Sequence, residues 1–166
     1  MSAGKILLIV YHSMTGGARQ MAEAACAGAM TEPGVQVSLL HATQAGPHDV
    51  LAADGYLFAT PEDLAAISGQ LKDFFDRSYY AALDRVNGRP YASLICAGSD
   101  GHNAARQIER IATGWRLKPV ADPLIVCTHA QTTEAILAPK QIGQDDLDAF
   151  RALGESMAAG LVLGVF

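Results

Sequence analysis

The sequence has few cysteines and no long apolar run. Its three cysteines, Cys26, Cys96 and Cys127, lie far apart, and each is surrounded by apolar or small residues. An odd number of cysteines in such settings indicates reduced, buried thiols rather than a disulfide framework. The longest purely apolar run, Ile6–Val10, is too short to span a bilayer, and the residues around it do not resemble a signal peptide. We therefore expect no membrane segment and a cytoplasmic location.

Charge is also scarce. Charged residues make up 17% of the sequence, and the formal net charge is −5. The lysines and arginines are scattered rather than clustered, so nucleic acid is not expected as a partner. A length of 166 residues suits one hydrophobic core and is too short for two ordinary domains, so we expect a single domain over residues 1–166.

Several catalytic and phosphate-binding motifs are absent. There is no G-x-x-x-x-G-K-[ST] triphosphate loop, no G-x-G-x-x-G dinucleotide motif and no G-x-S-x-G nucleophile motif. A low-molecular-weight phosphatase needs a cysteine in its first loop, and a receiver domain needs an aspartate at the end of its third strand, where this sequence has Ala59 and Thr60. These absences exclude a triphosphate site and argue against a phosphatase or a phosphorylation switch.

The most informative stretch that is present follows the first apolar run. Residues 6–11 are typical of a strand buried on both faces, and a helical pattern begins a few residues later. The loop between them carries two hydroxyl side chains and two glycines: Ser13, Met14, Thr15, Gly16, Gly17 and Ala18. Main-chain N–H groups at a helix start, glycines that permit close approach and hydroxyl donors predict a site for one phosphate. The alternative is an ordinary turn with Thr15 as the helix N-cap.

Strand-like runs alternate with helical patterns along the whole chain. Strands are expected over residues 6–11, 35–40, 55–59, 91–97 and 118–128, the last interrupted by Asp122 and Pro123. Helices are expected to include residues 21–29, 46–53, 65–80, 103–113 and 145–161. This alternation predicts an α/β fold, a doubly wound five-stranded parallel sheet of order 2-1-3-4-5 with helices on both faces. Ligands bind such sheets beyond the carboxyl ends of the strands.

Three loops at that edge carry a family resemblance. They read Y-H-S-M-T-G-G-A after the first strand, A-T-P-E-D-L-A-A-I-S-G-Q-L-K-D-F-F-D-R after the third and C-A-G-S-D-G-H after the fourth. In this order they resemble the cofactor loops of flavodoxin-fold proteins, most closely the flavodoxin-like quinone and flavin reductases that include the Trp-repressor-binding-protein group. The resemblance covers nearly the whole chain.

The resemblance implies one FMN bound without a covalent bond. Its phosphate would lie on the first loop, at Ser13, Met14, Thr15, Gly16, Gly17 and Ala18. The second loop would run beside the isoalloxazine ring and comprises Thr60, Pro61, Glu62, Asp63 and Leu64. The third would give main-chain donors to the pyrimidine edge of the ring and comprises Ala97, Gly98, Ser99, Asp100, Gly101 and His102. An aromatic residue commonly stacks on the ring from the second loop, and none is present there in this sequence.

The resemblance further implies an oxidoreductase that takes hydride from NAD(P)H and passes electrons to a quinone, a flavin or another small-molecule acceptor. Reductases of this kind are often homo-oligomers in which a neighbouring subunit completes the site. The modest net charge favours such an enzyme over an electron-carrier flavodoxin, because the carriers are usually more acidic. The missing aromatic leaves open a third hypothesis, a flavin-free binding module of the same fold.

No catalytic acid or base is assigned from the sequence. Asp100 and His102 are interpreted as residues that cap a helix start, and Cys127 with His129 are too few ligands to predict a metal site. Carboxylates of the second loop, if they face the ring, are expected to lower its reduction potential.

Overall fold

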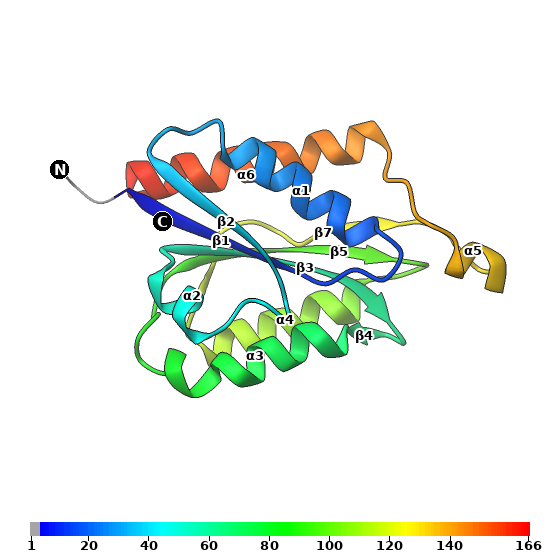
Figure 1. The fold of residues 1–166 in the computed structure, drawn as a ribbon, viewed down its shortest axis with the longest axis horizontal. Helices are drawn as coiled ribbons and strands as arrows, with labels where there is room; N and C mark the ends of the chain where they lie inside the picture. Colours follow the sequence, from blue (N-terminus) through cyan, green and yellow to red (C-terminus); the bar gives the residue numbers. More distant parts are fainter. Residues whose placement is uncertain (1–3) are drawn as a thin grey trace.

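The computed structural model describes residues 4–166 as alternating strands and helices (Figure 1). The strands are β1 (Lys5–Tyr11), β2 (Val35–His41), β3 (Gly55–Asp63), β4 (Ala66–Ile67), β5 (Pro90–Ala97), β6 (Lys118–Pro119) and β7 (Leu124–Cys127). The helices are α1 (Gly17–Ala29), α2 (Pro47–Ala52), α3 (Gly69–Ala82), α4 (His102–Gly114), α5 (Thr133–Leu137) and α6 (Gln144–Leu163). No helix within this part of the chain is both long and apolar enough to cross a membrane.

The sheet has the predicted topology. Its strands follow the order β2-β1-β3-β5-β6, and β7 also pairs with β5 beyond β6. All of these pairings are parallel, and the fifth strand of the predicted order is divided into β6 and β7 around Asp122 and Pro123. The predicted doubly wound order 2-1-3-4-5 is therefore confirmed, with β5 in the fourth place and β6 and β7 sharing the fifth.

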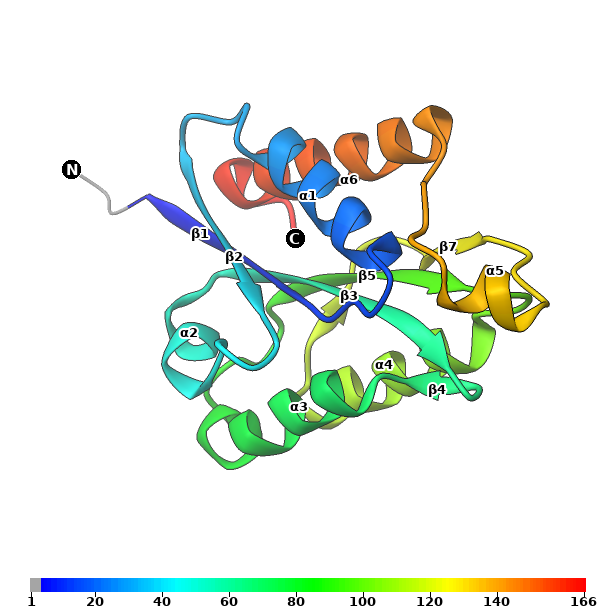
Figure 2. The same ribbon diagram turned by 45° about the vertical axis from the view of Figure 1, so that its right-hand side comes forward.

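Helices cover both faces of the sheet. Helices α1 and α6 lie on one face, and α2, α3 and α4 lie on the other (Figures 1 and 2). Because side chains alternate along a strand, Leu7 and Ile9 of β1 pack under α1 and α6, whereas Leu8 and Val10 face the other layer. All four residues are fully buried, as expected for a central parallel strand.

The helices on the two faces of the sheet pack in different ways. On one face, a Cβ at Gly154 of α6 would overlap the carbonyl of Ala25 in α1, so the two helix backbones meet without intervening side chains. On the other face, Phe58 of β3 packs edge-on against Phe75 of α3, with ring centroids 4.9 Å apart, and Trp115 packs against Phe75 at 5.4 Å. Aromatic side chains thus fill the layer beneath α3 and α4.

The largest difference from the sequence prediction lies after β3. The strand was expected to end near Ala59, with a helix from residue 65, but β3 continues to Asp63 and forms an antiparallel hairpin with β4. Ser68 then caps α3, accepting a hydrogen bond from the Leu71 N–H at 3.3 Å. Pro61 does not interrupt the strand, because its position still pairs with β5. The residues predicted as the first turn of α3 therefore form the second strand of the hairpin.

A second difference is the short helix α5, which was not predicted. It lies between β7 and α6 and projects beyond the carboxyl ends of the strands (Figure 2). With five residues and none of them buried, it has no amphipathic period that sequence analysis detects.

Candidate functional site

A pocket of about 430 Å³ opens at the carboxyl edge of the sheet. Its volume falls in the range of about 300–1,000 Å³ that is typical of small-molecule and cofactor sites. It brings together the three loops predicted from the sequence and a fourth segment that follows β7. Its lining includes these predicted residues: Ser13, Met14, Thr15, Gly17, Ala18, Pro61, Glu62, Asp63, Leu64, Ala97, Gly98 and Ser99. It also includes residues that were not predicted: Ala65, Cys96, Thr128, Ala130, Gln131, Ile136 and Lys140.

The first loop ends at Gly16, the N-cap of α1. Gly16 has a φ of 95°, a left-handed conformation that glycine adopts without strain. Its N–H donates to the Ser13 hydroxyl oxygen at 3.0 Å, which folds the loop back on itself. The expectation of Thr15 as the helix N-cap is therefore wrong, because Gly16 holds that position.

The start of α1 presents free donors to the pocket. Gly17 and Ala18 both line it, and within residues 4–166 their N–H groups donate no hydrogen bond. These are the unpaired donors of the first helical turn, where the helix dipole favours a negative charge. The arrangement suits an oxyanion, as the sequence predicted.

Gly17 also has a packing role that was not predicted. A Cβ at this position would overlap the sulfur of Cys96 in β5, so the glycine lets α1 approach the sheet. It was predicted only to permit approach of a ligand. The close helix-to-sheet contact places the first turn of α1 directly over the carboxyl end of β5.

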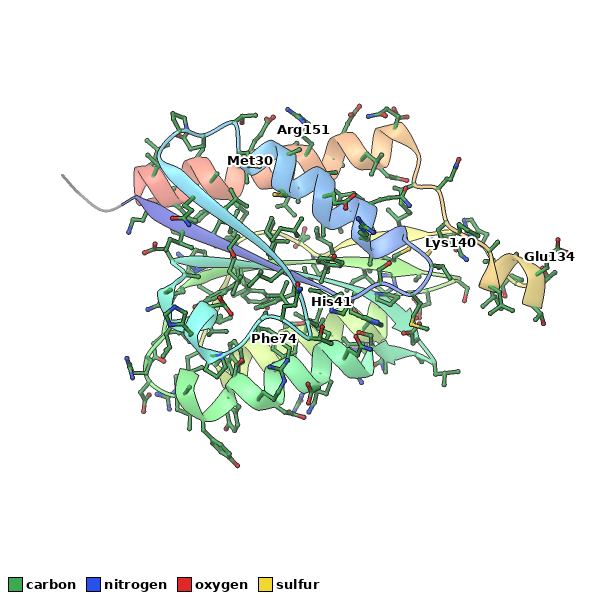
Figure 3. The ribbon with its side chains drawn as sticks, viewed as in Figure 1. Met30, His41, Phe74, Glu134, Lys140 and Arg151 are labelled. Atoms are coloured by element: carbon green, nitrogen blue, oxygen red, sulfur yellow. The ribbon has the colours of Figure 1, made fainter. Side chains whose placement is uncertain are left out.

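A segment that holds this loop was missed by sequence reasoning. Lys140 lies between α5 and α6, and its N–H donates to the carbonyl of Thr15 at 2.8 Å (Figure 3). Gln20 of α1 fixes the same segment by donating to the Lys140 carbonyl at 2.7 Å. The ammonium of Lys140 caps the end of α5 by donating to carbonyls of Ala135 and Ile136. No sequence motif signals this contact, because 120 residues separate Gln20 from Lys140.

The second loop is the turn of the β3–β4 hairpin. Its two central residues, Leu64 and Ala65, have φ values of 49° and 61°, as in a type I′ turn. Such turns usually hold asparagine or glycine, so these residues store strain at the mouth of the pocket. Leu64 is fully exposed at the tip.

The two carboxylates of this hairpin have different environments. Glu62 was expected to face the ring. Instead its carboxylate accepts hydrogen bonds from N–H groups of the third loop and of α4, at 2.9 and 3.0 Å. Asp63 is exposed overall, yet partial desolvation near the pocket wall raises its pKa, an effect that the neighbouring His12 opposes. Asp63 also lines the pocket, and within residues 4–166 its carboxylate accepts no hydrogen bond.

His12 lies beneath the first loop. Its side chain is 5% exposed, its Nδ1 atom has no hydrogen-bond partner within residues 4–166, and its ring packs edge-on against His41 at 5.5 Å. Burial, reinforced by His41, lowers the pKa of His12, so the ring is neutral near pH 7. Sequence analysis gave no reason to single out either histidine.

Five predicted residues do not line the pocket: Gly16, Thr60, Asp100, Gly101 and His102. Gly16 lies one residue from it in the first loop. Thr60 is fully buried and accepts a hydrogen bond from the Ser68 N–H at 3.1 Å, which holds the base of the hairpin. Its role is structural, whereas a ring contact was expected.

The third loop leads into α4 through Gly101, which has a φ of 92° and serves as N-cap. Asp100 and His102 form an exposed pair, with Oδ1 and Nδ1 2.6 Å apart. The hydrogen bond from His102 lowers the pKa of Asp100. This pair does not line the pocket. The expectation that these two residues cap the helix is wrong, because the N-cap is Gly101, which has no side-chain cap, and Glu62 accepts hydrogen bonds from the Gly101 and Ala104 N–H groups.

The three cysteines differ in burial. Cys96 is 8% exposed, and burial raises the pKa of its thiol, so it is the inert group expected. Cys26 and Cys127 are only partly buried, which corrects the expectation that all three are enclosed. Within residues 4–166 no three histidine, cysteine or acidic side chains are grouped to hold a metal ion.

The pocket offers hydrogen-bond donors of the kind that the phosphate and the ring of FMN require. Free N–H groups at the start of α1 are matched to a phosphate, and the hairpin and third loop leave an open slot beside them. Gly98 and Ser99 line the pocket as well, and their N–H groups donate no hydrogen bond within the described chain, so they are available to polar atoms of a ring.

Comparison with known proteins agrees with this geometry. The family model described as NADPH-dependent FMN reductase matches residues 41–132. A flavodoxin from Aquifex aeolicus is 38% identical over 167 residues, which cover 98% of this chain and 89% of that protein. An NAD(P)H dehydrogenase (quinone) from Acidithiobacillus ferrooxidans is 32% identical over 92 residues, covering 43% of this chain and 46% of that protein.

Solved structures support the same fold. A flavodoxin from the domain Archaea superposes with a TM-score of 0.75 at 16% identity, covering 94% of this chain and 98% of that one. The full-length sequence match and the family model together confirm the resemblance drawn from the three loops. The chain belongs to the flavodoxin-like, FMN-binding proteins of the NADPH-dependent FMN reductase family.

Proposed function

We propose that this protein binds one FMN at the carboxyl edge of the sheet and carries electrons in the manner of a flavodoxin. The observation that carries the proposal is the first turn of α1, whose free N–H groups at Gly17 and Ala18 line the pocket. The relative that matches nearly the whole chain is a flavodoxin, which supports the carrier over the enzyme favoured by the net charge.

The residues of this chain bind and orient the cofactor. Gly17 and Ala18 donate to the phosphate, and the nearby cation of Lys140 reduces the repulsion between a dianion and an acidic protein. Gly98 and Ser99 offer main-chain N–H groups to the ring edge. Bound FMN would supply the redox chemistry.

Apolar side chains surround the mouth of the pocket. Met14, Leu64 and Ile136 are exposed, and they come from the first loop, the hairpin tip and α5. Apolar groups that converge on one opening favour contact with a redox partner, a small-molecule acceptor or a second copy of the chain. The exposed Asp63 contributes negative charge to the same rim.

An NAD(P)H-dependent reductase is the second candidate. It is supported by the family model over residues 41–132 and by the hairpin tip, which bears Leu64 instead of an aromatic that covers the ring. An uncovered ring face leaves space for a nicotinamide. The same pocket serves both candidates, so they differ only in how the flavin receives electrons.

One set of measurements separates them. The purified protein is titrated with FMN, and NADPH and NADH are then added under exclusion of oxygen while the visible flavin band is followed. For a carrier, the band stays oxidised with either nucleotide, and the chemically reduced protein passes electrons to cytochrome c. Bleaching much faster than that of free FMN would instead establish the reductase. Absence of any FMN binding would contradict both candidates.

A further inference from the structure

We propose that Glu62 is a positioning residue that fixes the ring-binding third loop, and this inference rests on the proposed function. Glu62 belongs to the second loop in the sequence, but its carboxylate lies at the start of α4. One oxygen accepts from the Gly101 N–H at 2.9 Å and the other from the Ala104 N–H at 3.0 Å. A single side chain therefore joins two loops of the pocket.

A comparison of the first turns of α1 and α4 supports this role of Glu62. Both α1 and α4 follow a strand and a short loop, and both have a left-handed glycine as N-cap, Gly16 with a φ of 95° and Gly101 with a φ of 92°. The first turn of α1 is open to the pocket, whereas that of α4 is closed by the carboxylate of Glu62. An internal anion thus occupies one helix start and leaves the other to an external one.

Glu62 is the centre of a larger connection between the hairpin and α4. The side chain of Asn103 donates to the carbonyl of Ala65, and the Ile67 N–H donates to Oε1 of Gln107 at 2.8 Å. These contacts hold the hairpin along one side of α4, and among them, within residues 4–166, the contact of Glu62 is the one that reaches Gly101, the N-cap of α4.

Fixing Gly101 also fixes the residues before it. The N–H groups of Gly98 and Ser99, which line the pocket, have no partner within residues 4–166. The segment after β7 holds the carbonyl side of the same loop, because the His129 N–H donates to the Gly98 carbonyl at 2.8 Å and the Cys127 thiol to the Asp100 carbonyl at 3.5 Å. With Gly101 and Ala104 tied to Glu62, the orientation of these free donors toward the ring is set before a ligand binds. Preorganised donors bind more tightly than mobile ones, because less conformational freedom is lost.

This role predicts a specific division of binding energy. The phosphate of FMN contacts the start of α1, which Glu62 does not touch. Loss of Glu62 is therefore expected to weaken contacts with the ring and to leave contacts with the phosphate unchanged. A carboxylate that only stabilised the fold would not separate ring affinity from phosphate affinity.

Three variants test the proposal. Glu62→Gln removes the charge and turns an amide NH₂ toward one of the two donors, and Glu62→Asp keeps the charge but is shorter by about 1.5 Å, too short to reach both N–H groups. Glu109→Gln is the matched control, because it removes one carboxylate from an exposed position of α4, the helix whose start Glu62 contacts. The affinities for FMN, riboflavin and inorganic phosphate are measured for each, together with amide hydrogen exchange of Gly101 and Ala104 in the flavin-free protein.

For both Glu62 variants we expect FMN and riboflavin to bind about tenfold more weakly, with inorganic phosphate unchanged and with faster exchange at Gly101 and Ala104. Glu109→Gln is expected to match the wild type in all four. Wild-type flavin binding by the Glu62 variants, or a loss confined to FMN and phosphate, would overturn the inference and leave the proposed function standing. If the wild-type protein binds neither flavin, the proposed function fails together with the ring-positioning role, and the exchange data show only whether Glu62 caps α4.

Discussion

Replacing Gly17 by alanine tests how the phosphate loop is held against the sheet. A Cβ at this position would overlap the sulfur of Cys96, whereas the next nearest atoms, Cβ of Cys96 and Cβ of Lys140, are 3.6 Å away, at ordinary contact distance. A single sulfur atom is thus the obstacle. Because Cys96 lies in the centre of the sheet, we expect the start of α1 to move rather than the strand.

The magnitude follows from overpacking a close-packed contact. Gly17→Ala should lower the free energy of unfolding by about 1–3 kcal/mol. In a Cys96→Ala background the sulfur is gone, and the same substitution should be neutral or stabilise by up to about 1 kcal/mol, because alanine restricts the unfolded chain more than glycine does. The double variant should therefore lose less unfolding free energy than the sum of the losses of the two single variants.

Urea unfolding of the four proteins measures this coupling, and titration with FMN and riboflavin measures its effect on the site. Gly17→Ala should weaken the binding of FMN more than that of riboflavin. Adding Cys96→Ala should bring the ratio of the two affinities back to the wild-type value. If Gly17→Ala has the same effect in both backgrounds, the contact between α1 and the sulfur does not determine the position of the loop.

Three further predictions concern the pocket rim and its base. Leu64→Asn with Ala65→Gly should stabilise the protein by about 1–2 kcal/mol in urea unfolding, because the type I′ turn then holds residues that suit left-handed φ; no gain would mean that the hairpin is unstrained. The lowered pKa of His12 means that the unfolded chain takes up this proton first, so stability should decline as the pH falls through the ordinary value of 6.5 and level off below the folded pKa. His12→Phe should flatten this decline in pH-dependent unfolding, and an unchanged slope would assign it to another group. Asp63→Tyr should tighten oxidised FMN by about 1 kcal/mol through stacking, and an unchanged affinity would show that position 63 does not reach the ring.

Much of the fold could be predicted from the sequence, because it depends on local features of the chain. The apolar run Ile6–Val10, the alternation of strands with helices and the break at Pro123 each reflect physical properties of neighbouring residues, and together they predict the sheet order. The phosphate loop was predicted for the same reason, since its hydroxyls and Gly16 are adjacent to the helix they begin.

Features that depend on distant contacts were missed. The extension of β3 through Pro61 relies on pairing with β5, and the turn at Leu64 and Ala65 contains no residue that normally signals a hairpin. The contacts of Lys140 with the first loop and of Glu62 with α4 join residues far apart in the chain, and no spacing rule connects them. The three loops that line the pocket could therefore be predicted from the sequence, and the long-range contacts that join them could not.

The central claim is that the start of α1 holds the phosphate of one FMN. The most direct measurement compares the affinities of the wild-type, flavin-free protein for FMN and for riboflavin by fluorescence titration, with inorganic phosphate as competitor. We expect one FMN per chain, riboflavin binding weaker by at least about tenfold, and competition by phosphate against FMN alone. Equal affinities for the two flavins, with no effect of phosphate, would contradict the claim.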